Sequence, residues 1–231
     1  MRRILTIVIA ALALAAAQVA WAETSNEQAA VDRALAAVES LKTGPGAPPN
    51  LGELLHKARG IMIFPELVKA GFIFGAQGGS GVLLSRDPAT NNWSYPAFYV
   101  FGAGSFGLQA GIQMSKIVFI VMNDRALNAL MSDEFKVGAE AGIAIVTLGA
   151  GAEASTTSAA GGDIYAFAQA MGLFGGVALQ GGIIKPRLAY DHDYYGPTVR
   201  AEDIVLAGSA KNPGADPLRA ALAKASGGPT Q

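Results

Sequence analysis

Residues 72 to 84 read Phe-Ile-Phe-Gly-Ala-Gln-Gly-Gly-Ser-Gly-Val-Leu-Leu, an apolar segment that carries four glycines. Glycine inside a strand marks a bend, a bulge or a close approach between backbones. The feature extends through the centre of the chain, because 20 of its 29 glycines fall between Gly71 and Gly182. Its repetition on many strands predicts a tightly coiled sheet, closed or nearly closed, with small side chains where layers meet.

Short apolar segments bounded by glycines and turn residues continue this pattern on both sides. Their length and β-branched content are typical of strands. They are residues 61–64, 72–74, 82–84, 97–101, 117–122, 143–148, 164–167 and 177–179. One helix is expected among them, over 125–131, with Asn123 or Asp124 as its N-cap.

Helical spacing dominates the two ends of the chain. Residues 25–28 and 50–53 have the spacing of a capping box, which predicts a helix up to the Gly/Pro-rich loop and a second helix ending at Gly60. Asp216-Pro217 predicts the N-cap and first position of a helix through Lys224. The fold class expected is therefore α+β, with a glycine-rich, mostly antiparallel β core, coiled or barrel-like, and peripheral helices at both ends.

Four segments describe the expected organisation of the chain. They are a signal peptide at 1–22, an N-terminal helix and Pro/Gly linker at 23–50, the main domain at 51–200 and a helical extension at 201–231.

The start of the chain has the pattern of an export signal. Arg2-Arg3 precedes the apolar segment Ile4–Ala17, and Ala20-Trp21-Ala22 offers two small residues before Glu23. An uncleaved membrane anchor is the alternative, because residues Ile4 to Ala22 could just span a thinned bilayer. We expect cleavage between Ala22 and Glu23 and export to the periplasm or cell envelope. Cleavage leaves 15 basic residues against 18 acidic ones.

Composition removes several functional classes. Apolar residues make up 51% of the chain, charged residues 15%, and the formal net charge is -1. No broad cationic field is available to hold nucleic acid, so that partner is not expected. The absence of cysteine excludes disulfides, thiolate metal sites and a cysteine nucleophile.

A glycine motif at 102–107 permits a nucleotide interpretation. Gly-Ala-Gly-Ser-Phe-Gly matches G-x-G-x-x-G, and Asp124 lies 20 residues past Gly104, where a ribose-binding acid would stand. That chemistry requires a helix whose N-terminus faces the phosphates. The following segment is short and contains Gly111, so we interpret the motif as a bend between strands and expect no nucleotide and no cofactor.

The same motif permits a serine esterase. Ser105 stands in an alanine variant of the nucleophile elbow, and Asp163 and His192 follow in the chain order of α/β-hydrolases. An elbow requires a helix directly after the serine, which Gly107 opposes. The esterase stays an alternative, and the simpler interpretation of Ser105 is a small residue at a strand end.

Asp191-His192-Asp193 offers oxygen and nitrogen ligands to a metal. Consecutive residues in a strand or loop point in alternating directions, so one ion would rarely meet all three. We favour a hydrogen-bonded turn and expect no metal.

Eight motifs follow one another between residues 58 and 196. They are Ala-Arg-Gly-Ile-Met-Ile-Phe-Pro (58–65), Lys-Ala-Gly-Phe (69–72), Gly-Ser-Gly-Val-Leu (79–83), Trp-Ser-Tyr-Pro-Ala-Phe-Tyr (93–99), Gly-Leu-Gln-Ala-Gly (107–111), residues 118–123, Gly-Leu-Phe-Gly-Gly-Val (172–177) and Tyr-Tyr-Gly (194–196). In this order they resemble the SYLF domain family, over the main domain at 51–200. The resemblance implies a membrane-lipid or phosphoinositide binding module, with actin binding in some eukaryotic members and no established catalysis.

One feature departs from the family's lipid-binding adaptors. Their N-terminal helix is basic and amphipathic and meets the membrane, whereas the helix after Ser25 carries only Arg33 and Lys42 against three acids. Actin binding is not expected of a protein that carries an export signal.

Bases and aromatic residues near the first strands are the candidates for a lipid site. Residues 51–125 hold six bases against four acids. We predict a headgroup cluster of Lys57, Arg59 and Lys69, with Trp93 and Tyr95 as exposed interfacial aromatics. In the alternative, the aromatics fill the core and the bases are solvated, as in a structural envelope protein without lipid selectivity. The function expected is an exported, non-enzymatic module that binds membrane lipid through anionic headgroups.

Overall fold

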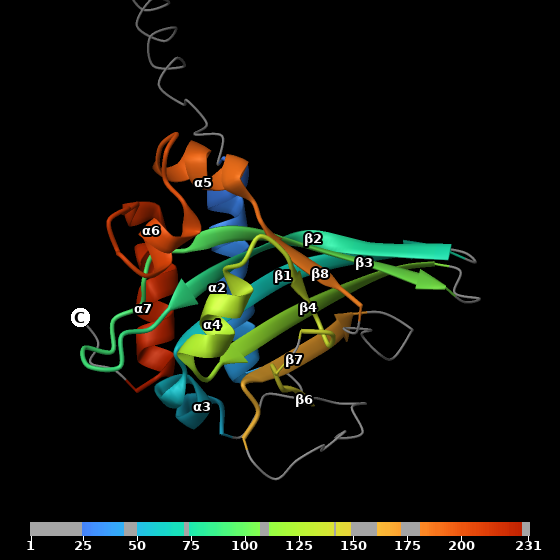
Figure 1. The fold of residues 1–231 in the computed structure, drawn as a ribbon, viewed down its shortest axis with the longest axis horizontal. Helices are drawn as coiled ribbons and strands as arrows, with labels where there is room; N and C mark the ends of the chain where they lie inside the picture. Colours follow the sequence, from blue (N-terminus) through green and yellow to red (C-terminus); the bar gives the residue numbers. More distant parts are fainter. Residues whose placement is uncertain are drawn as a thin grey trace, which may run out of the picture.

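One curled sheet organises the molecule (Figure 1). The computed structural model describes residues 25–43, 50–71, 74–106, 111–140, 142–148, 161–171 and 181–227. Within them, eight strands form a half-barrel in the order β5-β8-β3-β2-β1-β4-β7-β6. Helices from both ends of the chain pack on it, so the predicted α+β class with a coiled β core and peripheral helices is confirmed.

Four long strands form the centre of the sheet. They are β1 (Gly60–Gly71), β2 (Phe74–Ser85), β3 (Ala97–Phe106) and β4 (Gly111–Val121), all paired with antiparallel neighbours. Outside them lie β7 (Ile164–Met171) and β6 (Ile145–Leu148) on one side, and β8 (Ile183–Pro186) and β5 (Phe135–Lys136) on the other. Only the β6–β7 pair is parallel among the described strands, which confirms the mostly antiparallel prediction.

Helices cover both faces of the sheet. On one face, here called the α2 face, lie α2 (Asn26–Thr43), α3 (Leu51–Lys57) and α7 (Asp216–Ala225), whose apolar residues cluster with Ile61, Ile63, Val82 and Val118. On the other, the α4 face, lie α4 (Asp124–Leu130) and α6 (Ala201–Val205). The helix α5 (Leu188–Tyr195) packs beside β3 through ring contacts of Phe98 with Tyr190 and Tyr194.

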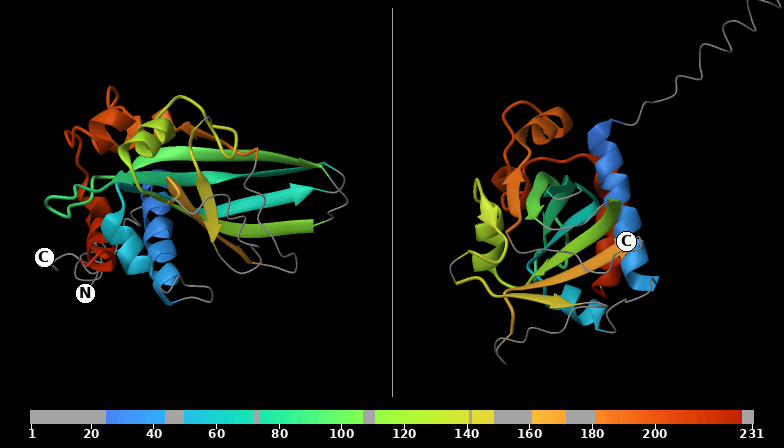
Figure 2. Two further views of the ribbon diagram at one scale, coloured as in Figure 1. Left: turned by 60° about the horizontal axis from the view of Figure 1, so that its bottom comes forward. Right: turned by 90° about the vertical axis from the view of Figure 1, so that its right-hand side faces the viewer.

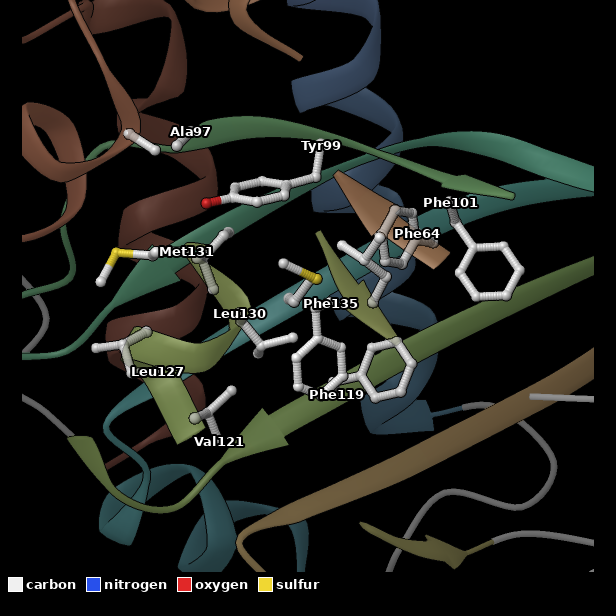
Figure 3. Close-up of a cluster of buried hydrophobic side chains, with 14 of the residues drawn as sticks. Phe64, Ala97, Tyr99, Phe101, Phe119, Val121, Leu127, Leu130, Met131 and Phe135 are labelled. Atoms are coloured by element: carbon white, nitrogen blue, oxygen red, sulfur yellow. The ribbon is translucent and has the colours of Figure 1, made fainter. Parts of the chain in front are cut away.

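The core of the α4 face is aromatic (Figure 3). Phe64 lies edge-on to Phe101 and Phe119, with ring centroids 5.7 and 6.3 Å apart. A glycine makes room for this ring, because a Cβ at Gly81 would overlap both the Phe64 ring and the carbonyl of Ile63. At this position the predicted close approach between backbones does occur.

Strand β1 is longer than the sequence pattern predicted. The expected strand stopped at Phe64, whereas β1 continues to Gly71. Its register shifts against β4 between Phe64 and Leu67, so the residues at 65 and 66 form a bulge. Proline is tolerated at such a bulge, because the ladder bond it cannot donate is interrupted there.

Two of the predicted helix starts are confirmed by their caps. The Gln28 amide donates to Ser25 Oγ at 3.2 Å, and Asn123 caps α4 by accepting from the Ala126 amide at 2.9 Å. Asn50, in contrast, makes no side-chain cap bond, and α3 ends at Lys57 rather than at Gly60.

The C-terminal part differs from the prediction in two ways. Residues 188–195 form the helix α5 where a turn was expected. A 3-10 turn (Pro213–Ala215) precedes α7, so Asp216 is its first helical residue rather than its N-cap. The predicted strand at 177–179 lies outside the described residues.

The far ends of β1 to β4 project past the helices. Figures 1 and 2 show these strands extending together to one side of the molecule, while all labelled helices gather at the other. This projection places residues 66–71, 74–80, 100–106 and 111–115 at an end of the sheet that the helices do not cover, and Lys116, which donates to Ser40 of α2, lies at its border.

Candidate functional site

The bases at the start of β1 are held in ion pairs. Lys57 Nζ lies 2.6 Å from Glu53 Oε1, and Arg59 Nε donates to Asp124 Oδ1 at 2.7 Å. Arg59 also donates to the carbonyl of Arg86 at 2.9 Å. These exposed pairs contribute little to stability, and they neutralise much of the charge that the headgroup prediction assigned to this corner.

Lys69 does not join them. It lies ten residues after Arg59, toward the far end of β1, which is a distance of roughly 33 Å at 3.3 Å per residue. It pairs across the sheet with Gln77 on β2 and Gln113 on β4. The single cluster predicted from the sequence is therefore not formed.

Trp93 is buried rather than interfacial. Its exposed fraction is 2%, and its indole N–H donates to Ser226 Oγ at 3.4 Å. The predicted exposure of Trp93 is wrong, and the core-filling alternative applies to it. It lies under the last turn of α7, and no pattern in the sequence indicates that α7 packs on this residue.

Tyr95 is half-buried and lines an open pocket of about 570 Å³ between residues 90–95 and α7. Its hydroxyl donates to Asp216 at 2.9 Å, and the Arg219 guanidinium stacks 4.1 Å from its ring centroid. Burial and the Asp216 carboxylate raise the pKa of the Tyr95 phenol. Both the ring and the hydroxyl are thus engaged with α7.

Among the described residues, the elements on either side of Ser105 are not those that the two enzymatic alternatives require. Ser105 belongs to the strand β3, and the next described element is another strand, β4. A nucleophile elbow and a dinucleotide fold each need a helix to follow the motif. Residues 102–106 of the motif continue β3 in unbroken register with β2, so the predicted bend is not found there, and Ser105 stands near the end of a strand as the simpler interpretation expected.

Asp163, the second member of the hypothetical triad, is engaged elsewhere. Its oxygens accept from the Asn123 amide group at 2.6 Å, from Arg125 Nη2 at 2.8 and 2.9 Å, and from the Ala144 N–H at 2.8 Å. These bonds, that of Ala144 foremost, lower the pKa of the Asp163 carboxyl. The carboxylate ties the start of β7 to the start of α4.

Asp191 is enclosed between α5 and β3. Its Oδ1 accepts from the Phe98 N–H at 2.9 Å, and burial raises the pKa of its carboxyl to about 7. On the helix α5, Asp191, His192 and Asp193 point around the axis instead of converging. Among the described residues, no three His, Asp or Glu side chains gather in a way that would hold a metal.

Sequence reasoning missed the exposed apolar residues at the projecting strand ends. Val68, Val100, Ile112 and Met114 have exposed fractions of 40, 38, 77 and 39%. A usable signal was present, because residues 70–85 and 88–115 contain no charged side chain. No helix in the described part of the chain is both long and apolar enough to cross a membrane.

Comparison with known proteins identifies the family of this chain. A family model described as Ysc84, Las17-binding protein actin regulator, matches residues 102–225, more than half of the chain. The chain belongs to the Ysc84 family. This is the SYLF family that the ordered motifs resemble, so the resemblance is confirmed.

Several members of the Ysc84 family are similar to the chain over most of its length. LAS seventeen-binding protein 3 of Saccharomyces cerevisiae is 32% identical over 175 residues, which are 74% of this chain and 37% of that protein. Human SH3 domain-containing YSC84-like protein 1 is 32% identical over 155 residues, 66% of this chain and 44% of that protein. The chain thus spans less than half the length of these relatives.

Proposed function

We propose that this Ysc84 family member is a non-enzymatic module that binds membrane lipid and prefers anionic headgroups. The observation that carries the proposal is the gathering of four exposed, large apolar side chains at the projecting end of the sheet. Exposed apolar groups in one place on a protein surface mark interaction sites, and a lipid surface takes up such groups.

The alternatives have less support. A serine esterase would need Ser105 at a strand-to-helix turn, and β3 is followed by β4. A purely structural envelope protein would have no use for exposed apolar residues bordered by bases. The family description refers to an actin regulator, but we propose lipid rather than actin as the partner, because residues 1–22 have the pattern of an export signal and an exported protein would not meet cytoplasmic actin.

Vesicle co-sedimentation tests the proposed function. We expect the protein to sediment with vesicles of phosphatidylcholine and phosphatidylglycerol, more than with phosphatidylcholine alone. The binding should weaken as salt is raised, because screening acts on exposed charges. Failure to sediment with either vesicle would contradict lipid binding, and equal binding to both would contradict the headgroup preference.

A further inference from the structure

The exposed apolar residues lie together on one face of the sheet. Strand β4 is regular, and Ile112 and Met114 lie an even number of residues from Val118. They therefore point to the same face as Val118, which is the α2 face. Met114 pairs with Val68, and Val68 pairs with Gly78. Because directly paired residues share a face, the same surface continues across β1, β2 and β3.

We call this region the strand-end surface. Its members are all apolar, and the structure exposes all of them except the partly buried Gly78; they are Val68, Ala70, Ala76, Gly78, Val100, Gly102, Gly104, Ile112 and Met114. A Cβ at Gly102 or Gly104 would meet no atom within 4 Å, so nothing in the described chain covers this face.

The opposite face of the same strand ends is more polar. A row of directly paired residues there reads Gln113, Lys69, Gln77 and Ala103. Gln77 is buried and donates to Ser115 Oγ at 2.9 Å. An antiparallel sheet with one face in water normally places its apolar residues inward and its polar residues outward. Here the order is reversed, which indicates an apolar environment outside the strand ends.

Bases border the strand-end surface on both sides. Lys116 follows Met114 on the same face and donates to Ser40 of α2 at 2.5 Å. Lys185 pairs directly with Val100 and lies 2.7 Å from Glu134, while Arg187 donates to Ser80 and stacks 3.4 Å from the Tyr190 ring centroid.

The acids near this border are fewer than the bases. Glu134 is shared between Lys136 and Lys185, and Glu66 stands in the bulge of β1. An apolar surface bordered by a net excess of bases is complementary to a lipid layer with anionic headgroups, and less so to a second copy of itself, whose bases would face these.

We infer that the strand-end surface inserts into the apolar layer of an anionic bilayer, with Lys116 and Arg187 at the level of the headgroups. The inference rests on the proposed lipid-binding function and assigns its site. From Val100 to Gly104 the surface extends about 13 Å, which suits insertion by roughly 5–10 Å and falls far short of the ~30 Å hydrocarbon core. Because α2 stands on the same face, only the projecting ends can enter.

A pair of matched variants tests the assignment. Ile112→Thr with Met114→Thr replaces two exposed side chains by a strand-compatible polar one. Leu206→Thr, at an exposed position after α6, is the control for loss of an apolar group elsewhere. We expect the double variant to reduce partition into phosphatidylcholine–phosphatidylglycerol vesicles by roughly tenfold or more, and the control to bind as the wild type does, with unchanged melting temperatures.

The outcomes separate the site from the function. If the wild type binds and the double variant binds equally well, the site is wrong and the proposed function stands. If the wild type does not bind these vesicles, both fail. If the double variant instead converts a dimer to a monomer without changing vesicle binding, the surface is an interface between two copies and the inference is overturned.

A fluorescent label gives a second, independent measurement. The chain has no cysteine, so Ile112→Cys and Leu206→Cys each carry one labelling site. An environment-sensitive dye at 112 should shift to the blue on vesicle binding, and the same dye at 206 should not. A dye at 112 that stays in water while the protein binds would overturn the inference.

Discussion

Asp191 places a carboxyl group where water does not reach. Its exposed fraction is 0%, Oδ1 accepts one backbone bond, and Oδ2 has no partner among the described residues. The Tyr99 hydroxyl is likewise buried with no hydrogen-bond partner in the described part of the chain, and its burial, followed by the charge of Asp191, raises the pKa of that phenol. A buried carboxyl in this setting is more stable when it holds its proton.

Stability should therefore depend on pH through Asp191. Its pKa is raised from 3.8 to about 7 in the folded protein, so between these values the folded chain holds a proton that the unfolded chain has released. The stabilisation that comes from this bound proton is complete below pH 3.8 and is lost as the pH rises toward about 7. Asn at position 191 does not titrate, so the wild type should lose stability relative to Asp191→Asn as the pH rises. Between pH 4 and pH 7 we expect the difference between their free energies of unfolding to shift in favour of the variant by a few kcal/mol, on the order of 1.4 kcal/mol per pKa unit. Parallel profiles for the two proteins in denaturant titrations would contradict this.

The lack of a side chain matters at Gly81 in β2 for a reason that does not apply to Gly102 in β3. A methyl group at Gly81 meets the Phe64 ring and the Ile63 carbonyl, whereas one at Gly102 meets nothing. Gly81→Ala should lower the free energy of unfolding by about 2 kcal/mol or more, because a packed core cannot absorb the added group. Gly102→Ala is the matched control and should change it by less than about 1 kcal/mol. Equal effects of the two changes would show that the close packing at Phe64 is not decisive.

Elements with a local signal could be predicted from the sequence, and those decided by tertiary contacts could not. The cap at Asn123 and the β-branched central strands are local features, and α4 and the strand cores appear where they were expected. In contrast, β1 passes through Pro65 because β4 accommodates a bulge there. The helix α5 has no amphipathic repeat, and contacts of its tyrosines with Phe98 hold it in place.

The cap of α4 also links that helix to the sheet. Asn123 accepts from the Ala126 amide and donates to Asp163 at 2.6 Å, so its loss affects two elements. Asn123→Ala should destabilise the protein by about 1–2 kcal/mol in thermal or chemical unfolding. Asn128→Ala, at an exposed position of the same helix, should be close to neutral. A cap variant as stable as this control would mean that α4 does not depend on Asn123.

The whole molecule separates two ends, and this separation explains why the candidate site was only partly predictable. The sequence indicated bases and aromatics near the first strands, but distance along β1 divides Lys69 from Arg59, and α7 covers Trp93. The strand-end surface depends on the register of four strands and on the bulge of β1, which composition does not reveal. The absence of charged residues from this part of the chain could be seen in the sequence. Whether these residues lie in the core or on the surface depends on where the helices pack, which the sequence did not indicate.

Processing of the chain start is a separate expectation at this scale. The small residues Ala20 and Ala22 predict that the exported protein begins at Glu23. N-terminal sequencing of the protein from an envelope fraction should find Glu23 first. An intact Met1 in that fraction would favour a retained anchor.

Hydrogen exchange of the wild-type protein, with and without phosphatidylcholine–phosphatidylglycerol vesicles, tests the central claim most directly. It needs no substitution and reports on every segment at once. The account predicts slower exchange on vesicles in peptides covering residues 66–71, 74–80 and 111–116, with α2, α3 and α7 unchanged. Protection of α3 and the Lys57–Arg59 corner with no change at the strand ends would contradict it.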